Sequence, residues 1–319
     1  GIISESDLFA LQRRTMAQVA DSIALAATEG DLVRAAGEIR ALADSLLAQG
    51  IGARNLTSLI VVLNDRLTQR ILDLAVDRHG LRDVQLCWLA LGSEGRQEQT
   101  IATDQDNAVI FAGPPGEGED ATRARLLPFA TEVNHTLDRC GFPLCKGNIM
   151  AGNPDLCLPV AVWRARFEEW MHAISPDALL RSMIFFDFRA IWGDRRLAEQ
   201  LRGWLSEAAQ GRALFQRTLA EVALRARAPI GFFGEFVTGG VAASTIDLKL
   251  QGTRIFVDVA RVFALHFGIG ATSTVERLQM TGIRLGIPTD AIEAAVDAFH
   301  FLQMLRLRQQ RREPSMPNS

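Results

Sequence analysis

Long apolar runs are absent from this sequence of 319 residues. A membrane-spanning helix needs about 20 consecutive apolar residues, and no stretch approaches that length, so we expect no membrane span. Charge of one sign is also lacking, because 34 Lys and Arg residues stand against 37 Asp and Glu residues and the net charge is only −3. A chain with this balance has no overall field that attracts nucleic acid. We therefore do not expect nucleic acid as a partner.

Cysteine is scarce as well, with four residues, Cys87, Cys140, Cys145 and Cys157. They lack the paired C-x-x-C spacing of a zinc site. A buried thiol is the simplest interpretation of Cys87, which lies in an apolar run. Isolated cysteines of this kind fit a reduced, cytoplasmic protein. With 48% hydrophobic and 22% charged residues, the composition is that of a globular protein, and the length suffices for one large or two ordinary domains.

The stretch from Trp88 to Phe111 contains the most specific pattern of polar residues. An apolar run ends at Gly92-Ser93, and the acidic pair Asp104-x-Asp106 then leads into a second apolar run. If this segment is extended, the two carboxylates project from the same face. Their repulsion is costly unless a cation or a proton neutralises them, and hard oxygen ligands of this kind suit Mg²⁺, or Mn²⁺ in its place.

Gly-Ser at the end of a strand, before a helical turn, presents backbone N–H groups and a hydroxyl to a phosphate. Each piece alone has a plainer explanation: Gly-Ser is usually a turn, and Asp-x-Asp is usually a solvated strand end. In the order strand, Gly-Ser, polar turn, Asp-x-Asp, strand, they predict a site for a metal-bound nucleoside triphosphate. The predicted residues are Gly92 and Ser93 for the nucleotide, and Asp104 and Asp106 for the metal and catalysis.

At these positions the chain resembles the nucleotidyltransferase superfamily that includes DNA polymerase beta, kanamycin nucleotidyltransferase and the glutamine-synthetase and PII-protein nucleotidylyltransferases. Those families share a Gly-Ser followed by Asp-x-Asp, onto which Gly92, Ser93, Asp104 and Asp106 fall. The fuller string, Gly-Ser-Glu-Gly-Arg-x-Glu-Gln and then Thr-Asp-Gln-Asp-Asn, resembles the branch found after CBS-domain pairs in bacterial signalling proteins. That branch is related to the N-terminal domain of PII uridylyltransferase.

The opening residues 1–9 look like the end of a CBS domain, whose last strand and helix commonly have the form Gly-Ile-Ile/Val-Thr-x-x-Asp-Leu. Together with the central resemblance, this predicts that the chain is part of a longer protein with a regulatory CBS pair upstream. The implied fold class is α+β, with a small mixed β-sheet core, a helical N-terminal segment and a mostly helical C-terminal domain. The domains we expect are a CBS remnant over 1–9, a helical lead-in over 10–80, the nucleotidyltransferase core over 81–156, and a C-terminal domain over 157–319 that binds the acceptor or the base.

Apolar periodicity and glycine breaks predict the individual elements. Helices are expected over about 7–49 with a break at Glu29-Gly30, and over 54–79, 120–140, 179–192, 197–228 and 255–267, with a last helix from Pro288. Strands are expected over 86–91, 108–111 and 144–150. The alternating segment Thr245–Thr253 predicts a further strand or hairpin arm.

Many relatives carry a third acid on a later strand, which completes the metal site. The segment Leu144–Met150 offers only Lys146 and Asn148. Asp187 or Asp247 could supply the third ligand from a distance, although an ion pair with a neighbouring arginine is the favoured interpretation of Asp187. For Asp247, a surface pair with Lys249 is favoured over a role at the substrate.

The resemblance implies that Ser93 and the backbone near Gly92 hold the β- and γ-phosphates of the nucleotide. Arg96 either adds a contact to those phosphates or pairs with Glu94 or Glu98. Two functions follow. One is a metal-dependent enzyme, PII-uridylyltransferase-like, that transfers a nucleoside monophosphate to a protein or small-molecule hydroxyl under CBS control. The other is an inactive nucleotide-binding signalling module. The acceptor and the nucleotide are not identified by the sequence, and a homodimer is compatible with it.

Overall fold

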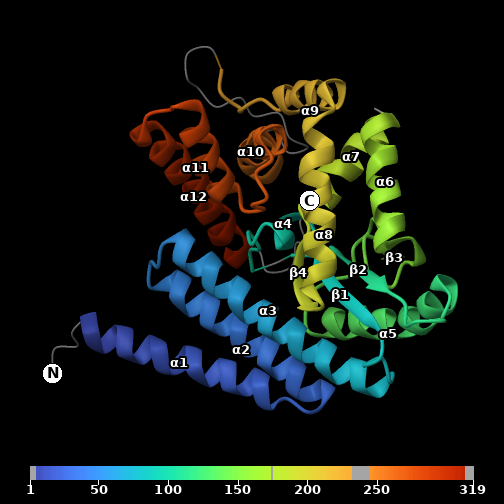
Figure 1. The fold of residues 1–319 in the computed structure, drawn as a ribbon. Helices are drawn as coiled ribbons and strands as arrows, with labels where there is room; N and C mark the ends of the chain where they lie inside the picture. The colour runs from blue at the N-terminus through green and yellow to red at the C-terminus, as the bar shows by residue number, and fades with distance from the viewer. Residues whose placement is uncertain (1–4, 102, 174, 232–244, 313–319) are drawn as a thin grey trace.

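A four-stranded mixed β-sheet lies at the centre of the computed structural model, which describes residues 5–101, 103–173, 175–231 and 245–312 (Figure 1). The strands follow the order β3-β2-β1-β4. Their bounds are Gln85–Ala90 (β1), Asn107–Ala112 (β2), Cys157–Pro159 (β3) and Arg189–Gly193 (β4). β1 pairs antiparallel with β2 and with β4, and β2 pairs parallel with β3. With helices on both faces of this small sheet, the predicted α+β class is confirmed.

Side chains of β1 alternate between two separate hydrophobic cores. Trp88 and Ala90 belong to the core on one face, and Cys87 and Leu89 belong to the core on the other. All four side chains are buried. A strand covered on both faces forms a continuous apolar run in the sequence, which is why β1 and β2 could be located from sequence.

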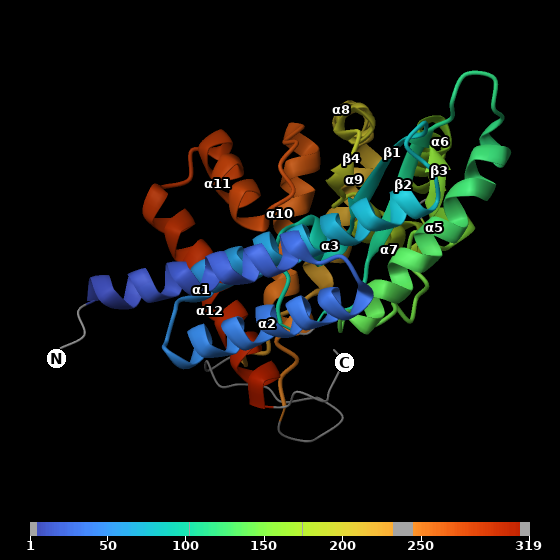
Figure 2. The ribbon, with the colours of Figure 1, turned by 90° about the horizontal axis from the view of Figure 1, so that it is seen from below.

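Four helices lie on the first side of the sheet: α1 (Glu5–Leu25), α2 (Glu29–Ala48), α3 (Ala53–Arg78) and α5 (Glu119–Arg139). Helices α3 and α5 contact the strands, and α1 and α2 pack on α3. Helices α1, α2 and α3 pack side by side, and α3 also packs on α5 (Figures 1 and 2). The break predicted near residue 29 is confirmed, because Thr28 and Asp31 form a capping box at the start of α2. The helices predicted over 54–79 and 120–140 are confirmed as α3 and α5. Of the predicted CBS remnant, residues 1–4 lie outside the described residues and 5–9 begin α1.

The second face is covered by α6 (Val160–Ala173), α7 (Pro176–Phe185), α8 (Arg195–Gln210) and α9 (Ala213–Arg225). Aromatic rings fill the core beneath these helices, with the rings of Phe167 and Phe186 4.9 Å apart. The Trp163 indole N–H donates to the Val109 carbonyl at 3.1 Å and ties α6 to β2. The aromatic residues that recur along α6 are therefore core, as their helical spacing indicates.

The strand predicted over 144–150 is wrong. Asn148 has φ +54° and follows a turn at residues 146–147, so the chain cannot stay extended there. Two backbone hydrogen bonds hold this loop beside the Asp-x-Asp segment, from Gln105 to Pro143 and from Asn107 to Ile149. After a short 3₁₀ helix, η1 (Pro154–Leu156), strand β3 takes the place next to β2.

The helix predicted over 179–192 is wrong in its second half, where the chain forms strand β4. The Arg189 guanidinium makes a bidentate pair with Asp65 of α3, at 2.7 and 2.9 Å, and the strand pairs with β1. These partners are remote in the sequence, and they outweigh the weak local preference of a short segment for helix.

The C-terminal part contains η2 (Lys249–Thr253, a π-helical turn), α10 (Arg254–Phe267), α11 (Thr274–Leu285) and α12 (Thr289–Arg312). The helix predicted over 255–267 and the last helix are confirmed, whereas α11 is an addition. The strand predicted over 245–253 is wrong, because the Asp247 carboxylate accepts from the backbone N–H groups of Lys249 and Leu250, both at 2.8 Å. These bonds wind the chain into a turn. Helix α12 contacts α3, so the C-terminal helices adjoin the N-terminal ones (Figure 1).

No helix in the described part of the chain combines the length and the apolarity that crossing a bilayer requires.

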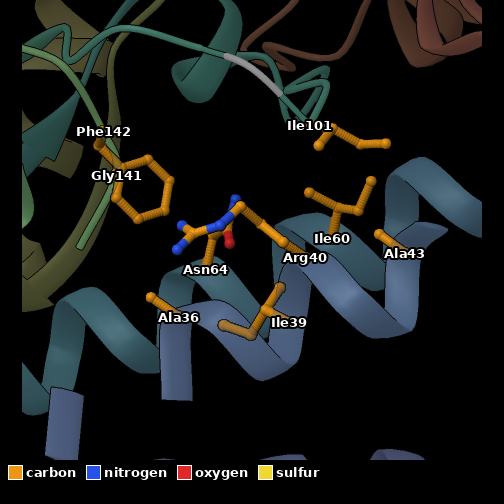
Figure 3. A pocket seen from close by; sticks show the side chains of 9 residues that line it. All are labelled: Ala36, Ile39, Arg40, Ala43, Ile60, Asn64, Ile101, Gly141 and Phe142. Atoms are coloured by element: carbon orange, nitrogen blue, oxygen red, sulfur yellow. The ribbon is translucent and has the colours of Figure 1, made fainter. Parts of the chain in front are cut away.

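Arg40 of α2 joins the helical lead-in to the turn after α5, beside a small cavity of about 20 Å³ (Figure 3). Its guanidinium donates to the Cys140 carbonyl at 2.6 Å. Gly141, the next residue, has φ +91°, and a Cβ there would lie 2.5 Å from the guanidinium. Both the backbone conformation and the lack of space at this position therefore disfavour a side chain.

We expect Gly141→Ala to lower the free energy of unfolding by about 1–3 kcal/mol. Gly37→Ala, within α2, is the matched control. A Cβ at Gly37 meets nothing within 4 Å, and alanine in a helix interior is favoured over glycine by up to about 1 kcal/mol. Urea denaturation of both variants measures the difference, and equal stabilities would contradict the role assigned to Gly141.

Candidate nucleotide and metal site

The ends of β1 and β2 bring Gly-Ser and Asp-x-Asp together. The backbone N–H of Leu91 donates to the Asp106 carbonyl at 2.9 Å, and the short helix α4 (Gly92–Gly95) begins at the next residue. Gly92 has φ +53°, and a Cβ on it would lie 2.9 Å from an Asp106 carboxylate oxygen. Only glycine leaves room for that carboxylate at this point. The predicted helical turn after the strand is present, and Gly92 lies against Asp106.

Gly92, Ser93, Asp104 and Asp106 line one cavity of about 360 Å³. One wall comes from this core segment, which extends to Arg96, Glu98, Thr100 and Thr103. Helix α7 contributes apolar side chains, among them Met183 and Ile184. The remaining wall comes from η2, α10 and α12, with Lys249, Arg254, Asp258, Arg261, Gln303 and Arg306. The cavity therefore lies between the nucleotidyltransferase-like core and the C-terminal helices.

Burial and the neighbouring Asp104 carboxylate together raise the pKa of Asp106 to about 7. A hydrogen bond with Cys145 and the charges of Lys249 and Arg96 oppose this rise without cancelling it. The ionised Asp106 is thus under-neutralised, and a bound cation would relieve this repulsion. Two carboxylates in a polar cavity provide hard oxygen donors of the kind Mg²⁺ takes, usually alongside phosphate oxygens and water. The donor set fits a divalent cation.

Asp104 and Asp106 are the two acids of the cavity lining that form no ion pair among the described residues, whereas Glu98 and Asp258 are paired with arginines. Within the described ranges, no three His, Cys, Asp or Glu side chains cluster closely enough to hold a metal ion by themselves. Metal binding by Asp104 and Asp106 stays a prediction, and the 144–150 segment contains no acid.

Buried side-chain amides hold the Asp-x-Asp segment in place from the side that faces away from the cavity. Gln105 and Asn107 alternate with the two acids and point away from the cavity, and both are buried. The Asn134 side chain, on α5, donates to the side-chain oxygens of Gln105 and Asn107, both at 2.9 Å. The Gln105 amide donates in turn to the Asn134 carbonyl at 2.9 Å. The sequence did not lead us to predict this group of hydrogen-bonded amides. The polar residues that alternate with the two acids at the start of a strand are the pattern that indicates it.

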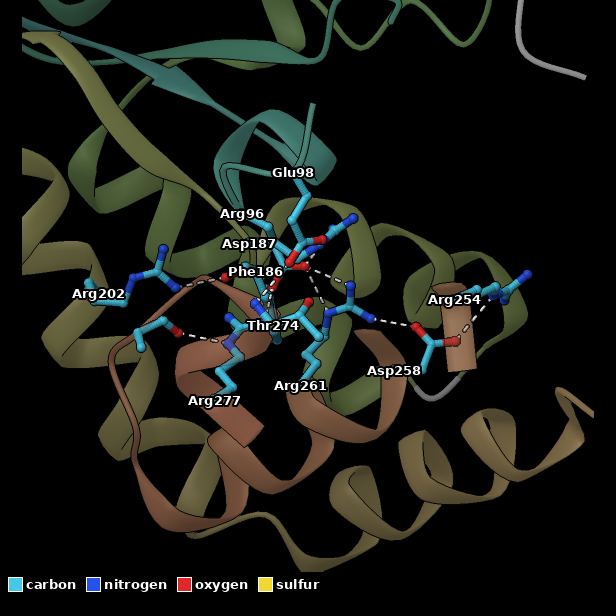
Figure 4. Close-up of polar contacts among 11 residues, drawn as sticks. Arg96, Glu98, Phe186, Asp187, Arg202, Arg254, Asp258, Arg261, Thr274 and Arg277 are labelled. Carbon is cyan, nitrogen blue, oxygen red and sulfur yellow. Dashed lines mark hydrogen bonds and ion pairs between the residues drawn. The ribbon is translucent and has the colours of Figure 1, made fainter. Parts of the chain in front are cut away.

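Arg96 is engaged by two carboxylates (Figure 4). It donates to Glu98 at 2.8 Å and to Asp187 at 2.9 Å. Burial alone would lower the pKa of Arg96, but these two carboxylates hold it above the usual value. Of the predicted alternatives, the ion pair with Glu98 is the one the structure contains. Glu98 also accepts from the backbone N–H of Thr274 at 2.9 Å, at the start of α11.

Asp187 is fully buried and surrounded by three guanidinium groups (Figure 4). One carboxylate oxygen accepts from Arg96 and from Arg261 at 2.6 Å, and the other accepts from Arg277 at 2.7 Å. Although burial alone would raise it, Arg261, Arg277 and Arg96 hold the pKa of this carboxyl far below its usual range. The favoured interpretation of Asp187 as an ion-pair residue agrees with these contacts. It is not among the residues that line the cavity, which disfavours it as a third ligand.

Asp247 is also occupied locally. Its carboxylate caps η2 through the Lys249 and Leu250 N–H groups, and it does not line the cavity either. The Lys249 side chain does line it. Glu94 lies behind the site, where burial, Asp65 and Asp106 raise its pKa to about 8 against the opposing charge of Arg189. The raised pKa favours the uncharged form of Glu94 at neutral pH.

A strand ending at Gly-Ser, a helical turn and an Asp-x-Asp that leads into the antiparallel neighbour are the parts of a nucleotidyltransferase core. Family models agree with this class. Residues 37–177 match the family described as "Putative nucleotidyltransferase DUF294", and residues 213–316 match its companion, described as "Putative nucleotidyltransferase substrate binding domain". The chain belongs to this nucleotidyltransferase family. No curated protein matches it.

The second match, over 213–316, includes η2, α10, α11 and α12, the elements that form the C-terminal wall of the cavity. Both matched segments therefore contribute to one cavity. CBS association and the domain boundaries given above remain predictions.

Proposed function

We propose that the protein is a divalent-metal-dependent nucleotidyltransferase that moves a nucleoside monophosphate from a nucleoside triphosphate to a hydroxyl group of a protein or small molecule. The observation that carries this proposal is the shared cavity of Gly92, Ser93, Asp104 and Asp106, with a pKa of about 7 at Asp106. An under-neutralised carboxylate pair beside a Gly-Ser turn suits a metal-bound triphosphate.

In the proposed reaction the acceptor hydroxyl oxygen attacks the α-phosphorus. The bond from that phosphorus to the oxygen bridging to the β-phosphate breaks, pyrophosphate leaves with the bonding electron pair, and the hydroxyl proton passes to water. Asp104 and Asp106 would hold the metal ion, which supplies charge neutralisation at the phosphates when bound. Ser93 orients the phosphate chain through its hydroxyl. The hydrogen-bonded side-chain amides of Gln105, Asn107 and Asn134 keep the two carboxylates pointing into the cavity.

Transfer to the PII signalling protein is the activity implied by the resemblance, and regulation by an upstream CBS pair belongs to the same proposal. A second function has one observation in its favour: among the described residues, no group of three or more His, Cys, Asp or Glu side chains could hold a metal ion. A site that binds the metal ion less tightly suits a signalling module. Such a module binds the nucleotide and signals that the nucleotide is present, without transferring a nucleoside monophosphate.

Labelled nucleotides separate these two functions. Each of the four nucleoside triphosphates, labelled at the α-phosphate, is incubated with the protein, Mg²⁺ or Mn²⁺ and cell extract. We expect label to appear on an acceptor, and to disappear with Asp104→Asn or Asp106→Asn. Asp138→Asn, at an exposed position on α5, is the matched control and should transfer normally. Tight nucleotide binding without any transfer would contradict the enzyme proposal and support the signalling module.

A further inference from the structure

Five basic side chains line the cavity, and three of them are engaged by carboxylates. Arg96 pairs with Glu98 and Asp187. Arg261 pairs with Asp187 at 2.6 Å and with Asp258 at 2.7 Å. Arg254 pairs with Asp258 at 3.1 Å. Each of these guanidinium groups is held by an ion pair within the fold, although Asp187 is also shared with Arg277.

Lys249 and Arg306 are the other two basic residues of the cavity, and neither forms an ion pair within the part of the chain that the structure describes. Lys249 is exposed at the first position of η2, where Asp247 fixes its backbone N–H. Arg306 is half-buried on α12 and donates to the neutral Gln303 side chain at 3.3 Å. A half-buried guanidinium with only an amide acceptor has hydrogen-bonding capacity left over.

The opposite wall carries the complementary charge. Asp104 and Asp106 likewise form no ion pair among the described residues, and the Lys249 ammonium is near enough to Asp106 to favour its ionised form. The cavity therefore has an unbalanced pair of carboxylates on the core side and an unbalanced pair of cations on the C-terminal side. A polyphosphate that carries a divalent cation matches both walls at once, with the metal toward the carboxylates and the outer phosphates toward the cations.

We propose that Lys249 and Arg306 bind the β- and γ-phosphates of the nucleoside triphosphate. The C-terminal helices then supply phosphate-binding cations beyond Arg96, whose guanidinium is already engaged by Glu98 and Asp187. This inference rests on the proposed function and extends it, because it makes the nucleotide a bridge between the core and the C-terminal wall. Arg306 suits bidentate contact with phosphate oxygens, and Lys249 acts as a point charge.

Inorganic tripolyphosphate tests the proposal without knowledge of the base or the acceptor. Its affinity in the presence of Mg²⁺ is measured by calorimetry for the wild type, Lys249→Gln, Arg306→Gln and the double variant. We expect each single variant to weaken binding about 10-fold or more and the double variant about 100-fold, since each loses a charge-assisted contact. Arg308→Gln is the matched control, because Arg308 is exposed on the same helix and does not line the cavity.

The outcomes distinguish this inference from the proposed function. If Lys249→Gln and Arg306→Gln bind tripolyphosphate like the wild type while Asp106→Asn loses its Mg²⁺-dependent binding, the two cations do not hold phosphate, and the nucleotidyltransferase proposal stands. If the wild type binds neither tripolyphosphate nor any nucleoside triphosphate, both proposals fail. Circular dichroism checks folding, and the exposed position of Lys249 keeps one variant informative should Arg306→Gln be unstable. Arg306→Lys, which keeps the charge but not the bidentate geometry, should lose less affinity than Arg306→Gln.

Discussion

Asp106→Asn is expected to lower nucleotidyl transfer at least about 1,000-fold and at the same time to make the metal-free protein more stable at neutral pH. Activity falls because the variant lacks one of the two carboxylates that we propose to hold the metal ion. Stability rises because the wild-type protein carries a carboxylate whose charged form is disfavoured in the folded state, by burial and by Asp104. Asparagine keeps the size of the side chain without the charge.

The sign of the pH dependence follows from the raised pKa. Between the ordinary aspartate value of about 4 and the value of about 7 in the folded protein, the folded state binds more protons at Asp106 than the unfolded state does. Wild-type stability contributed by this group therefore falls as pH rises through that window and levels off above it. The advantage of Asp106→Asn should be small at pH 4 and reach about 1–3 kcal/mol at pH 8.

Thermal or urea denaturation across this pH range, with a chelator present, measures the effect. Adding Mg²⁺ should stabilise the wild type and not Asp106→Asn, because only the wild type retains both ligands. Asp138→Asn serves again as the control and should follow the wild type within about 0.5 kcal/mol at every pH. A variant less stable than the wild type at pH 8 would show that Asp106 is not under-neutralised in the folded protein.

Local sequence rules were sufficient for the parts of the site that are close together along the chain. The two acids face one cavity because side chains of an extended segment alternate, and the same alternation buries Gln105 between them. Strands β1 and β2 are buried on both faces, so each forms an unbroken apolar run. The stripe along α3 follows the helical period, and its residues, such as Leu67 and Ile71, are core.

The rest of the site depends on contacts that no local rule contains. Asp187 meets Arg261 and Arg277, which are 74 and 90 residues away in the sequence. Helical periodicity predicted a helix that continues to residue 192. These remote partners instead hold Asp187 in the segment between α7 and β4. In the same way, the C-terminal wall brings Lys249 and Arg306 to the cavity only because η2 and α12 pack together. The sequence therefore predicts the core side of the cavity, and the tertiary contacts add the opposite wall.

Asp187→Asn is expected to destabilise the protein by about 3–5 kcal/mol, the usual consequence of removing one partner from a buried ion pair. The carboxylate is fully buried, and the side chains of Arg261 and Arg277 are only 4% and 3% exposed. Asparagine offers one acceptor oxygen and no charge to three guanidinium groups. Two of these come from α10 and α11, so the loss loosens the C-terminal wall against the core. Urea denaturation at pH 7 measures the change.

The contribution of Asp187 to stability should also be measurable in the wild type as the pH is lowered. Because the three arginines depress the pKa of Asp187 in the folded state, its contribution is fully present above the ordinary aspartate value of about 4 and is lost as pH falls further. Asp187→Asn lacks this component and should show a shallower loss of stability in acid. Glu221→Gln is the matched control: it breaks an exposed pair with Arg217, whose side chains are 52% and 77% exposed, and should cost less than about 1 kcal/mol. If Asp187→Asn and Glu221→Gln cost the same, the three-arginine cluster does not anchor the C-terminal helices, and the wall that carries Lys249 and Arg306 must be held by its apolar contacts instead.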